Sequence, residues 1–199
     1  SPIGWNFVES DFMLLFDLSR RARIEISGRD AREFLHNLCT QEVKNLPVGV
    51  WRETFFTTNK ARVLAHGWIF HREADRVWLD LPAGYGDAIL GHLERHHISE
   101  RLELANRTEA WGFLRLVGAG ASALADAAGL VPDHRHRLLV QEGVDFLRPR
   151  DELATVRDGL LRAGASMGDA DAYEIMRIEA GLPGMGIGID GGRLAMGGN

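Results

Sequence analysis

Apolar and polar residues alternate in some stretches of the chain, and apolar residues recur at helical spacing in others. Alternation predicts half-buried strands, because successive side chains of a strand point to opposite faces. Spacing of three and four residues predicts helices that bury one side. The predicted strands cover 23–27, 51–58, 62–71, 76–81, 101–104, 111–117, 137–140 and 144–147. The predicted helices cover 31–38, 85–97, 122–128, 151–163 and 169–180.

The order of these elements favours an α+β fold. The strands at 51–58 and 62–71 flank the short segment Asn59-Lys60-Ala61, which is typical of a hairpin turn. Hairpins with helices on one side indicate a mostly antiparallel sheet rather than a βαβ alternation. The second half opens as the first does, with a strand, a turn of small residues and a helix. We therefore expect two related units that pack together.

Composition narrows the class of protein. Of 199 residues, 45% are apolar and 26% charged, which is typical of a soluble globular domain. The net charge of −5 argues against a general nucleic-acid binder, which needs a basic face. The single cysteine, Cys39, excludes a disulfide framework and a cysteine-rich metal site, and we expect it to fill core space. No run of 18 apolar residues predicts a membrane span. We expect a cytoplasmic location, or the mitochondrial matrix in a eukaryote.

Glu179 is the most informative single residue. Ala172, Ile175 and Met176 define an inward stripe on the last predicted helix, and position 179 continues it. A carboxylate there loses hydration and meets the negative end of the helix dipole. We therefore expect Glu179 either to pair with an arginine such as Arg177 or Arg162, or to line a cavity where a ligand supplies the donor.

Two other patterns have ordinary structural interpretations. Gly118-x-Gly120-x-x-Ala123 lies between a strand and a helix, where a dinucleotide-binding loop would lie. Since no acidic residue follows a second parallel strand at the usual distance, we expect only a tight turn. His92, His96 and His97 invite a metal site, but we expect a solvated helix end there, and we likewise expect His134 and His136 to lie in a polar loop. The sequence thus predicts no metal site.

Four stretches, which together span about residues 20 to 190, follow a known order of motifs. They are Phe34-Leu35-x-x-Leu38-x-Thr40-x-x-Val43, Asn59-Lys60-x-Arg62-Val63-Leu64-Ala65, Gly143-Val144-Asp145-Phe146-Leu147-x-Pro149 and Arg177-Ile178-Glu179-Ala180-Gly181-Leu182-Pro183. In these stretches the chain resembles the superfamily of the glycine-cleavage T-protein and YgfZ, which are folate-binding proteins. The second stretch is more similar to the YgfZ branch.

The resemblance implies two interleaved ferredoxin-like subdomains with antiparallel sheets around a central tetrahydrofolate cavity. Residues 1–50 with 108–199 would form one subdomain and 51–107 the other, and the C-terminal β-domain of the family would be absent. Glu179 would hold the pterin, whose ring N–H and exocyclic amine a carboxylate can accept together. Lys60 and Arg62 would attract the anionic glutamyl tail, unless they are ordinary surface charges.

The chain also departs from the family pattern. Ala65 and His66 occupy the region where the T-protein has the aspartate needed for aminomethyl transfer. Pro82 stands where the T-protein has an asparagine near the end of the next strand. His66 is the candidate catalytic residue, since histidine exchanges protons near neutral pH, although a strand histidine is more often merely accommodated. The cysteine-containing segment of YgfZ-like proteins is not found in this sequence.

Three hypotheses follow. The first is a YgfZ-like tetrahydrofolate-binding protein that supports assembly or maintenance of iron–sulfur enzymes and lacks aminomethyltransferase activity. The second is an active tetrahydrofolate-dependent aminomethyl or one-carbon transferase, with His66 as its only candidate catalytic residue. The third is a ligand-free scaffold that binds a protein partner through a relic cavity. A nicotinamide-dependent enzyme remains a distant alternative.

Overall fold

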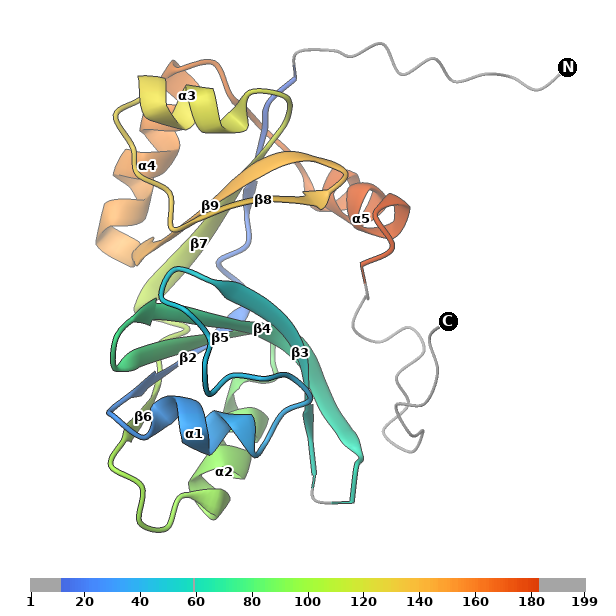
Figure 1. Cartoon of the computed structure of the whole chain (residues 1–199). Coiled ribbons are helices and arrows are strands. Elements are labelled where there is room, and N and C mark those ends of the chain that lie inside the picture. The colour runs from blue at the N-terminus through green and yellow to red at the C-terminus, as the bar shows by residue number, and fades with distance from the viewer. Residues whose placement is uncertain (1–11, 59, 183–199) are drawn as a thin grey trace, which may run out of the picture.

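The computed structural model describes residues 12–58 and 60–182, which form two five-stranded sheets that lie one above the other (Figure 1). The upper sheet has the strand order β10-β1-β7-β9-β8, and the lower sheet has the order β3-β4-β5-β2-β6. All neighbouring strands are antiparallel except β1 and β10. The predicted α+β class with antiparallel sheets is therefore confirmed.

The upper sheet comprises β1 (Leu14–Asp17), β7 (Trp111–Val117), β8 (His134–Leu139), β9 (Gln141–Pro149) and β10 (Ser166–Met167). The lower sheet comprises β2 (Ala22–Ser27), β3 (Trp51–Thr57), β4 (Val63–Glu73), β5 (Arg76–Leu81) and β6 (Glu103–Asn106). The helices are α1 (Ala31–His36), α2 (Gly86–His96), α3 (Ala121–Ala127), α4 (Arg150–Arg162) and α5 (Ala170–Glu179).

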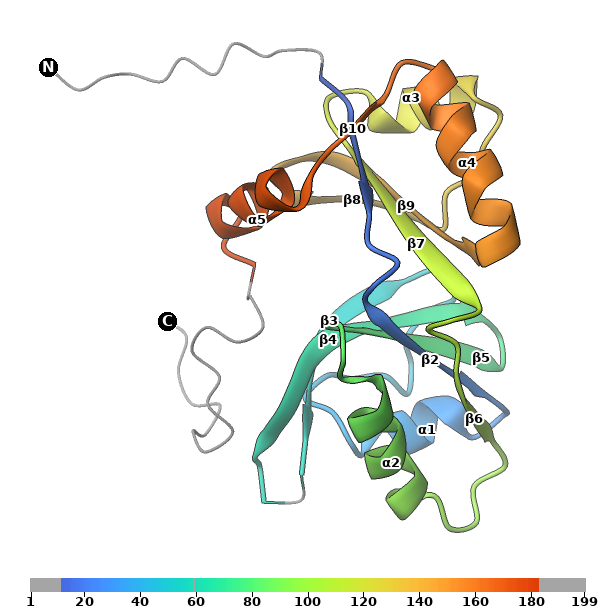
Figure 2. The ribbon, with the colours of Figure 1, turned by 180° about the vertical axis from the view of Figure 1, so that it is seen from behind.

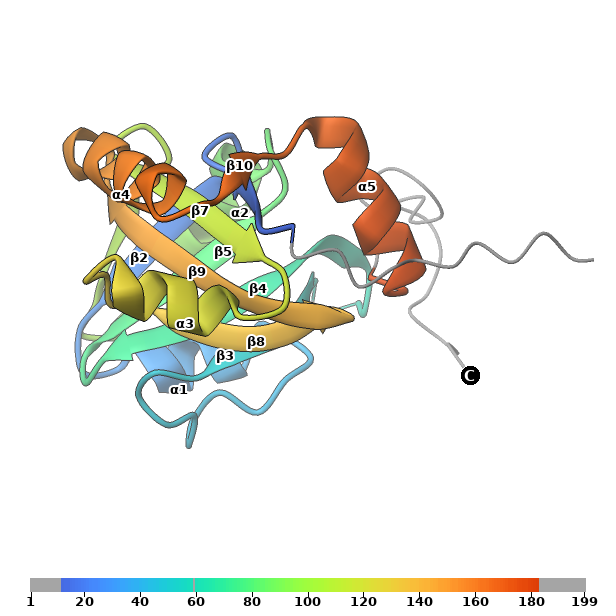
Figure 3. The ribbon, with the colours of Figure 1, turned by 90° about the horizontal axis from the view of Figure 1, so that it is seen from above.

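Helices cover the outer face of each sheet. α1 and α2 lie beneath the lower sheet, where side chains such as Ile24, Ile69 and Leu79 are fully buried (Figure 1). α3 and α4 lie above the upper sheet and bury residues such as Leu116 and Phe146 (Figure 3). Each of these strands places alternate residues outward, which is why the alternating sequence pattern predicted them well.

The inner faces of the two sheets pack on each other through aromatic residues. The ring of Trp51 on β3 stacks on that of Phe70 on β4 with centroids 4.5 Å apart, and it meets Phe113 of the upper sheet edge-on at 5.7 Å. Trp78 and Leu147 complete this cluster. Large aromatic surfaces buried between the sheets fix their relative position.

α5 packs on the inner face of the upper sheet, on the opposite side from α3 and α4 (Figures 2 and 3). Its side chains meet a cluster formed by Phe16, Val117 and Leu139. The side chain of Asp169 accepts a hydrogen bond from the backbone N–H of Ala172 at 2.7 Å, so the helix begins with a capping residue. The helix therefore stands beside the junction between the two sheets.

The sheets divide the chain differently from the expected grouping. β2 pairs with β5 along six residues, from Ala22 opposite Leu81 to Ser27 opposite Arg76. Residues 22–50 therefore lie with the lower sheet, whereas the family resemblance groups them with 108–199. The short strands β1 and β10 were not predicted, because two to four residues carry little periodic signal.

Two local expectations can be compared with the structure. His134 and His136 belong to β8, so their expected position in a polar loop is wrong; β9 pairs with them through Asp145 and Gly143. The turn before α3 is tight, as expected. The carboxylate of Glu142 accepts hydrogen bonds from the backbone N–H groups of Gly120 and Ser122, both at 3.0 Å. A side chain of the protein therefore takes the position that a dinucleotide phosphate would need.

Within the described ranges, none of the helices is both long and apolar enough to traverse a lipid bilayer.

Candidate functional site

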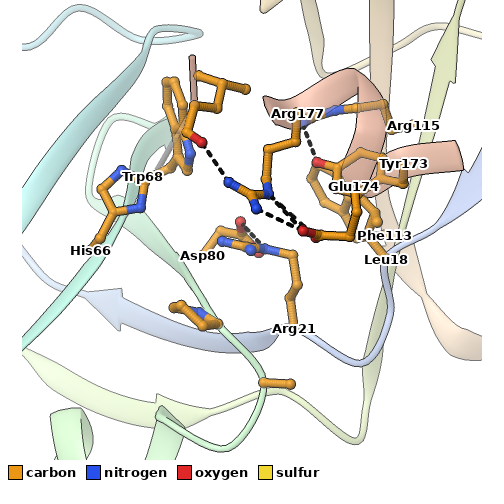
Figure 4. Close-up of a pocket in the computed structure, with 13 residues that line it drawn as sticks. Leu18, Arg21, His66, Trp68, Asp80, Phe113, Arg115, Tyr173, Glu174 and Arg177 are labelled. Atoms are coloured by element: carbon orange, nitrogen blue, oxygen red, sulfur yellow. Dashed lines mark hydrogen bonds and ion pairs between the residues drawn. The ribbon is translucent and has the colours of Figure 1, made fainter. Parts of the chain in front are cut away.

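A pocket of about 220 Å³ opens between the lower sheet, the upper sheet and α5 (Figure 4). Each of the three contributes polar and apolar side chains to its wall. The lining residues are Leu18, Arg21, His66, Trp68, Asp80, Pro82, Ala83, Phe113, Arg115, Tyr173, Glu174, Arg177 and Leu182. His66, the candidate catalytic residue, and Pro82 are both among them.

His66 lies on β4 with its ring on the inner face of the lower sheet, and only 5% of the residue is exposed. Its Nε2 atom lies 2.6 Å from Oε1 of Glu53 on the neighbouring strand β3. The ring of Phe55 lies 5.2 Å from the imidazole, centroid to centroid. A histidine held by a carboxylate and facing a pocket is able to exchange a proton with a bound molecule.

Asp80 on β5 supplies a carboxylate to the pocket. Its Oδ2 accepts a hydrogen bond of 2.7 Å from Nε of Arg21, whose side chain is a quarter exposed. Its Oδ1 is buried and has no hydrogen-bond partner within 12–58 and 60–182, although Nη1 of the buried Arg23 lies 3.9 Å away. A buried acceptor without a donor costs about 1–3 kcal/mol.

α5 forms the third wall through a row of hydrogen-bonded side chains (Figure 4). The guanidinium of Arg115 on β7 donates to the hydroxyl of Tyr173 at 3.0 Å. One turn along, Arg177 binds the carboxylate of Glu174 with a shortest distance of 2.6 Å and donates to the carbonyl of Leu182 at 2.5 Å. The side chain of Arg177 is 13% exposed and that of Glu174 is 54% exposed, so the pair lies at the mouth of the pocket with its acid largely in solvent.

Behind this wall, Asp145 on β9 is the centre of a buried polar cluster. Both its oxygens accept hydrogen bonds from Arg115, at 2.7 and 2.8 Å, and it also contacts His134 at 3.2 Å and His136 at 3.0 Å. Burial alone would raise the pKa of Asp145, but Arg115 and these hydrogen bonds hold it well below its usual value.

The two histidines and Asp145 present ligand atoms within 4.8 Å of one another, a spacing that could suit a metal ion. A cation at this point would compete with Arg115, which already neutralises both oxygens of the carboxylate. The chemistry of the donor set therefore favours an ion pair inside the protein over a metal ligand set.

Glu179 does not line the pocket, and its side chain is exposed. The expectation that it turns inward is wrong, because α5 buries a different face from the predicted one. Ala172, Tyr173, Met176 and Ala180 pack against the upper sheet, whereas Ile175, expected on the inward stripe, is 57% exposed. The buried face is thus rotated away from position 179 by most of a quarter turn.

Lys60 and Arg62 are exposed and lie at the end of the β3–β4 hairpin, outside the pocket lining. The backbone N–H groups of both residues donate to the hydroxyl of Thr58, at 3.3 and 3.2 Å, which shapes the turn. In the described chain they are therefore not brought together with His66.

Sequence reasoning missed Glu53, Asp80 and Tyr173. The signal for Asp80 was present, since a charged residue in the apolar strand 76–81 marks a face that is not ordinary core. The alternation in that strand predicts only its other face, formed by Val77, Leu79 and Leu81. Tyr173 carried no comparable signal, because its importance arises from a contact with β7, 58 residues away.

Comparisons with known proteins agree with this architecture. A glycine cleavage system aminomethyltransferase T from Bartonella henselae superposes with a TM-score of 0.79 at 21% identity, over 88% of this chain and 53% of that one. A heterotetrameric sarcosine oxidase from Corynebacterium gives a TM-score of 0.52 at 12% identity, over 79% of this chain and 88% of that one. At 21% and 12% sequence identity, these similarities show a shared fold and nothing more.

Curated sequences give a consistent result. A putative chloroplastic transferase of Arabidopsis thaliana is 26% identical, over 86% of this chain and 44% of its own length. An aminomethyltransferase of Rubrobacter xylanophilus is 27% identical, over 84% of this chain and 50% of its own. The chain thus spans about half the length of these relatives. Residues 11–133 match the GCVT N-terminal domain, which is more than half of the sequence, and the chain therefore belongs to the GCVT N-terminal domain family.

Proposed function

We propose that this chain binds a reduced folate in the pocket between its two sheets and serves folate-dependent one-carbon chemistry. The observation that carries this proposal is a pocket with aromatic walls and the inward carboxylate of Asp80, in a member of the GCVT N-terminal domain family. Reduced folate is thus the proposed small-molecule partner.

The side chains fit the pterin end of such a ligand. Trp68 and Phe113 offer apolar surface to a flat ring system, and Asp80 offers acceptors to the adjacent ring N–H and exocyclic amine. The volume of about 220 Å³ is below the roughly 300 Å³ at which drug-sized sites begin. The pocket would therefore hold the bicyclic head, and the glutamyl tail would extend from its open side.

Calorimetric titration with 5-formyltetrahydrofolate, a stable reduced folate, tests the binding. We expect Asp80→Asn to weaken affinity about tenfold or more, because a hydrogen bond to a charged group contributes about 1.5–3 kcal/mol. Asp126→Asn, an exposed acid on α3, is the matched control and should leave affinity unchanged. No binding by the unchanged protein would contradict the proposal.

Glu179, Lys60 and Arg62 remain predictions as folate ligands. Their exposure gives no support to a direct role. In the same titration, a tenfold loss with Glu179→Gln would restore the role that the resemblance implies. A loss confined to polyglutamylated ligand with Lys60→Ala or Arg62→Ala would do so for the tail.

An active aminomethyl or one-carbon transferase is favoured by one specific observation, the carboxylate-bound His66 in the pocket. Tetrahydrofolate, when bound, supplies the nitrogen that receives the one-carbon unit. The protein would hold that nitrogen near Nδ1 of His66, which takes its proton, and would limit the access of water to the pocket. Formation of methylenetetrahydrofolate from an aminomethyl-loaded carrier protein is the assay, and a background rate would exclude this activity.

The auxiliary role in iron–sulfur enzyme maintenance rests on the YgfZ-like motif at residues 59–65. Its partners would be iron–sulfur enzymes or their assembly proteins, in the cytoplasm or an organelle matrix. Recovery of iron–sulfur enzyme activity in cells deprived of their own YgfZ-type protein tests this role. A ligand-free scaffold would instead give no folate titration signal, and Asp80→Asn would leave any recovery unchanged.

A further inference from the structure

We infer that Glu53 is the positioning residue for His66: it holds the imidazole through Nε2 and leaves Nδ1 to accept a proton from an N–H group of a bound ligand. The inference rests on the proposed function for the identity of that ligand, a reduced folate. It concerns the arrangement of two side chains, which can be measured without a ligand.

The strand register brings the two residues together. Phe55 lies opposite His66, and Glu53 lies opposite Trp68, so Glu53 and His66 are diagonal neighbours on the inner face of the lower sheet. A glutamate side chain is long enough to span such a diagonal. The resulting distance of 2.6 Å between Oε1 and Nε2 is that of a strong, charge-assisted hydrogen bond.

This bond fixes which nitrogen carries the hydrogen. A carboxylate can only accept, so the Nε2 atom of His66 must be the donor. In the neutral ring Nδ1 then keeps its lone pair. Within 12–58 and 60–182, Glu53 is the hydrogen-bond partner of the His66 ring, and Nδ1 has none. Because His66 lines the pocket, Nδ1 is the atom that remains for a ligand.

Glu53 itself lies outside the pocket lining, and its side chain is 38% exposed. It therefore reaches a ligand only through His66. The other carboxylate nearby, Asp80, is bound to Arg21 and belongs to the pocket wall. The two acids thus have separate tasks: Asp80 meets the ligand, and Glu53 orients the base.

The proton step balances when it accompanies transfer of the one-carbon unit. As the ligand nitrogen forms its new bond to that carbon, the former partner of the carbon leaves with its electron pair. An N–H bond of the nitrogen breaks, its electron pair stays on the nitrogen, and the proton forms a new bond with Nδ1. The ring becomes an imidazolium, whose positive charge the Glu53 carboxylate offsets through Nε2–H. Return of the proton to water or to a leaving group restores the neutral ring.

Nitrogen-15 spectra of the histidine rings at pH 8 test the arrangement in the ligand-free protein. We expect a single Nε2–H tautomer for His66 and a ring N–H proton signal protected from exchange, assigned by its loss in His66→Gln. Glu53→Ala should remove the protected signal and shift both ring nitrogens. Glu42→Ala, whose acid lies 3.6 Å from the ring of His36, is the matched control and should leave His66 unchanged.

Unchanged His66 signals in a folded Glu53→Ala protein would overturn the inference. Addition of 5-formyltetrahydrofolate provides a second readout, in which the Nδ1 resonance of His66 should move more than that of Nε2. If the protected signal is present but the folate does not bind, the positioning role stands and the proposed function falls. For an active enzyme, Glu53→Ala should lower kcat at least tenfold and leave folate affinity within twofold.

Discussion

Arg115 and Asp145 lie opposite each other on β7 and β9 and share two parallel hydrogen bonds of 2.7 and 2.8 Å. Asp145 is fully buried, and the side chain of Arg115 is 8% exposed. The same guanidinium donates to Tyr173 and faces the pocket, so one buried pair connects the core of the upper sheet to the site.

Removing the acid of this pair leaves a buried cation without compensation. We expect Asp145→Asn to lower the free energy of unfolding by about 3–5 kcal/mol, as measured by urea denaturation at pH 7. Asp126→Asn removes the acid of an exposed pair with Arg135, also at 2.7 Å, and should cost less than about 1 kcal/mol. Equal effects of the two variants would show that burial of the Asp145 pair does not matter.

Acid should destabilise the protein partly through His92 on α2. Burial lowers the pKa of this imidazole, and the neighbouring His96 and Arg95 add to the effect. As pH falls below about 6.5, the unfolded chain takes up a proton at His92 and the folded chain does not. The contribution of neutral His92 to the free energy of unfolding is thus complete above that pH. It is lost as pH falls through the lower pKa that His92 has in the folded protein.

His92→Leu removes this titration and keeps an apolar side chain at a buried position. We expect its unfolding free energy to decrease less than that of the unchanged protein between pH 7.5 and pH 5.5. His36→Gln, at a more exposed histidine, provides the control. Parallel pH profiles for His92→Leu and the unchanged protein would contradict the assignment.

Substitutions at Gly28 and Gly84 distinguish the cost of an unfavourable backbone conformation from the cost of steric crowding. Both have a positive φ, +136° and +85°, which disfavours a side chain. A Cβ at Gly28 would collide with the backbone of Arg101 and lie 2.6 Å from Cα of Leu102, whereas one at Gly84 would meet nothing within 4 Å. We expect Gly28→Ala to cost about 2–4 kcal/mol and Gly84→Ala about 1 kcal/mol in urea denaturation. A reversed order would mean that the β2–α1 turn adapts easily.

The sequence predicts this fold better than it predicts the site. Strand alternation shows which residues face the helices, as with Val77 and Leu79 on β5. It does not show that the opposite face, with Trp78 and Asp80, is covered by a second sheet, because that contact joins distant parts of the chain. His66 was predicted from a motif comparison, whereas its partner Glu53 depends on the register of β3 and β4.

The orientation of α5 illustrates the same limit. Positions 172, 175, 176 and 179 form an acceptable helical stripe, and so do 172, 173, 176 and 180. The structure selects the second, because the ring of Tyr173 meets that of Phe16 edge-on at 5.1 Å and its hydroxyl reaches Arg115. Only the tertiary partner decides between two stripes that differ by a fraction of a turn.

Tyr173→Phe tests how firmly this helix is held. The change keeps the ring contact with Phe16 and removes the hydroxyl that accepts from Arg115 at 3.0 Å. Since hydrogen bonds to a charged group contribute about 1.5–3 kcal/mol, we expect faster amide hydrogen exchange along α5, while exchange in the lower sheet stays unchanged. Tyr173→Ala should release the helix further, because the apolar contact is lost as well.

Affinity for 5-formyltetrahydrofolate should fall in the same order, since α5 forms one wall of the pocket. If Tyr173→Phe left both exchange and affinity unchanged, the packing of Ala172, Met176 and Ala180 alone would hold α5 against the upper sheet.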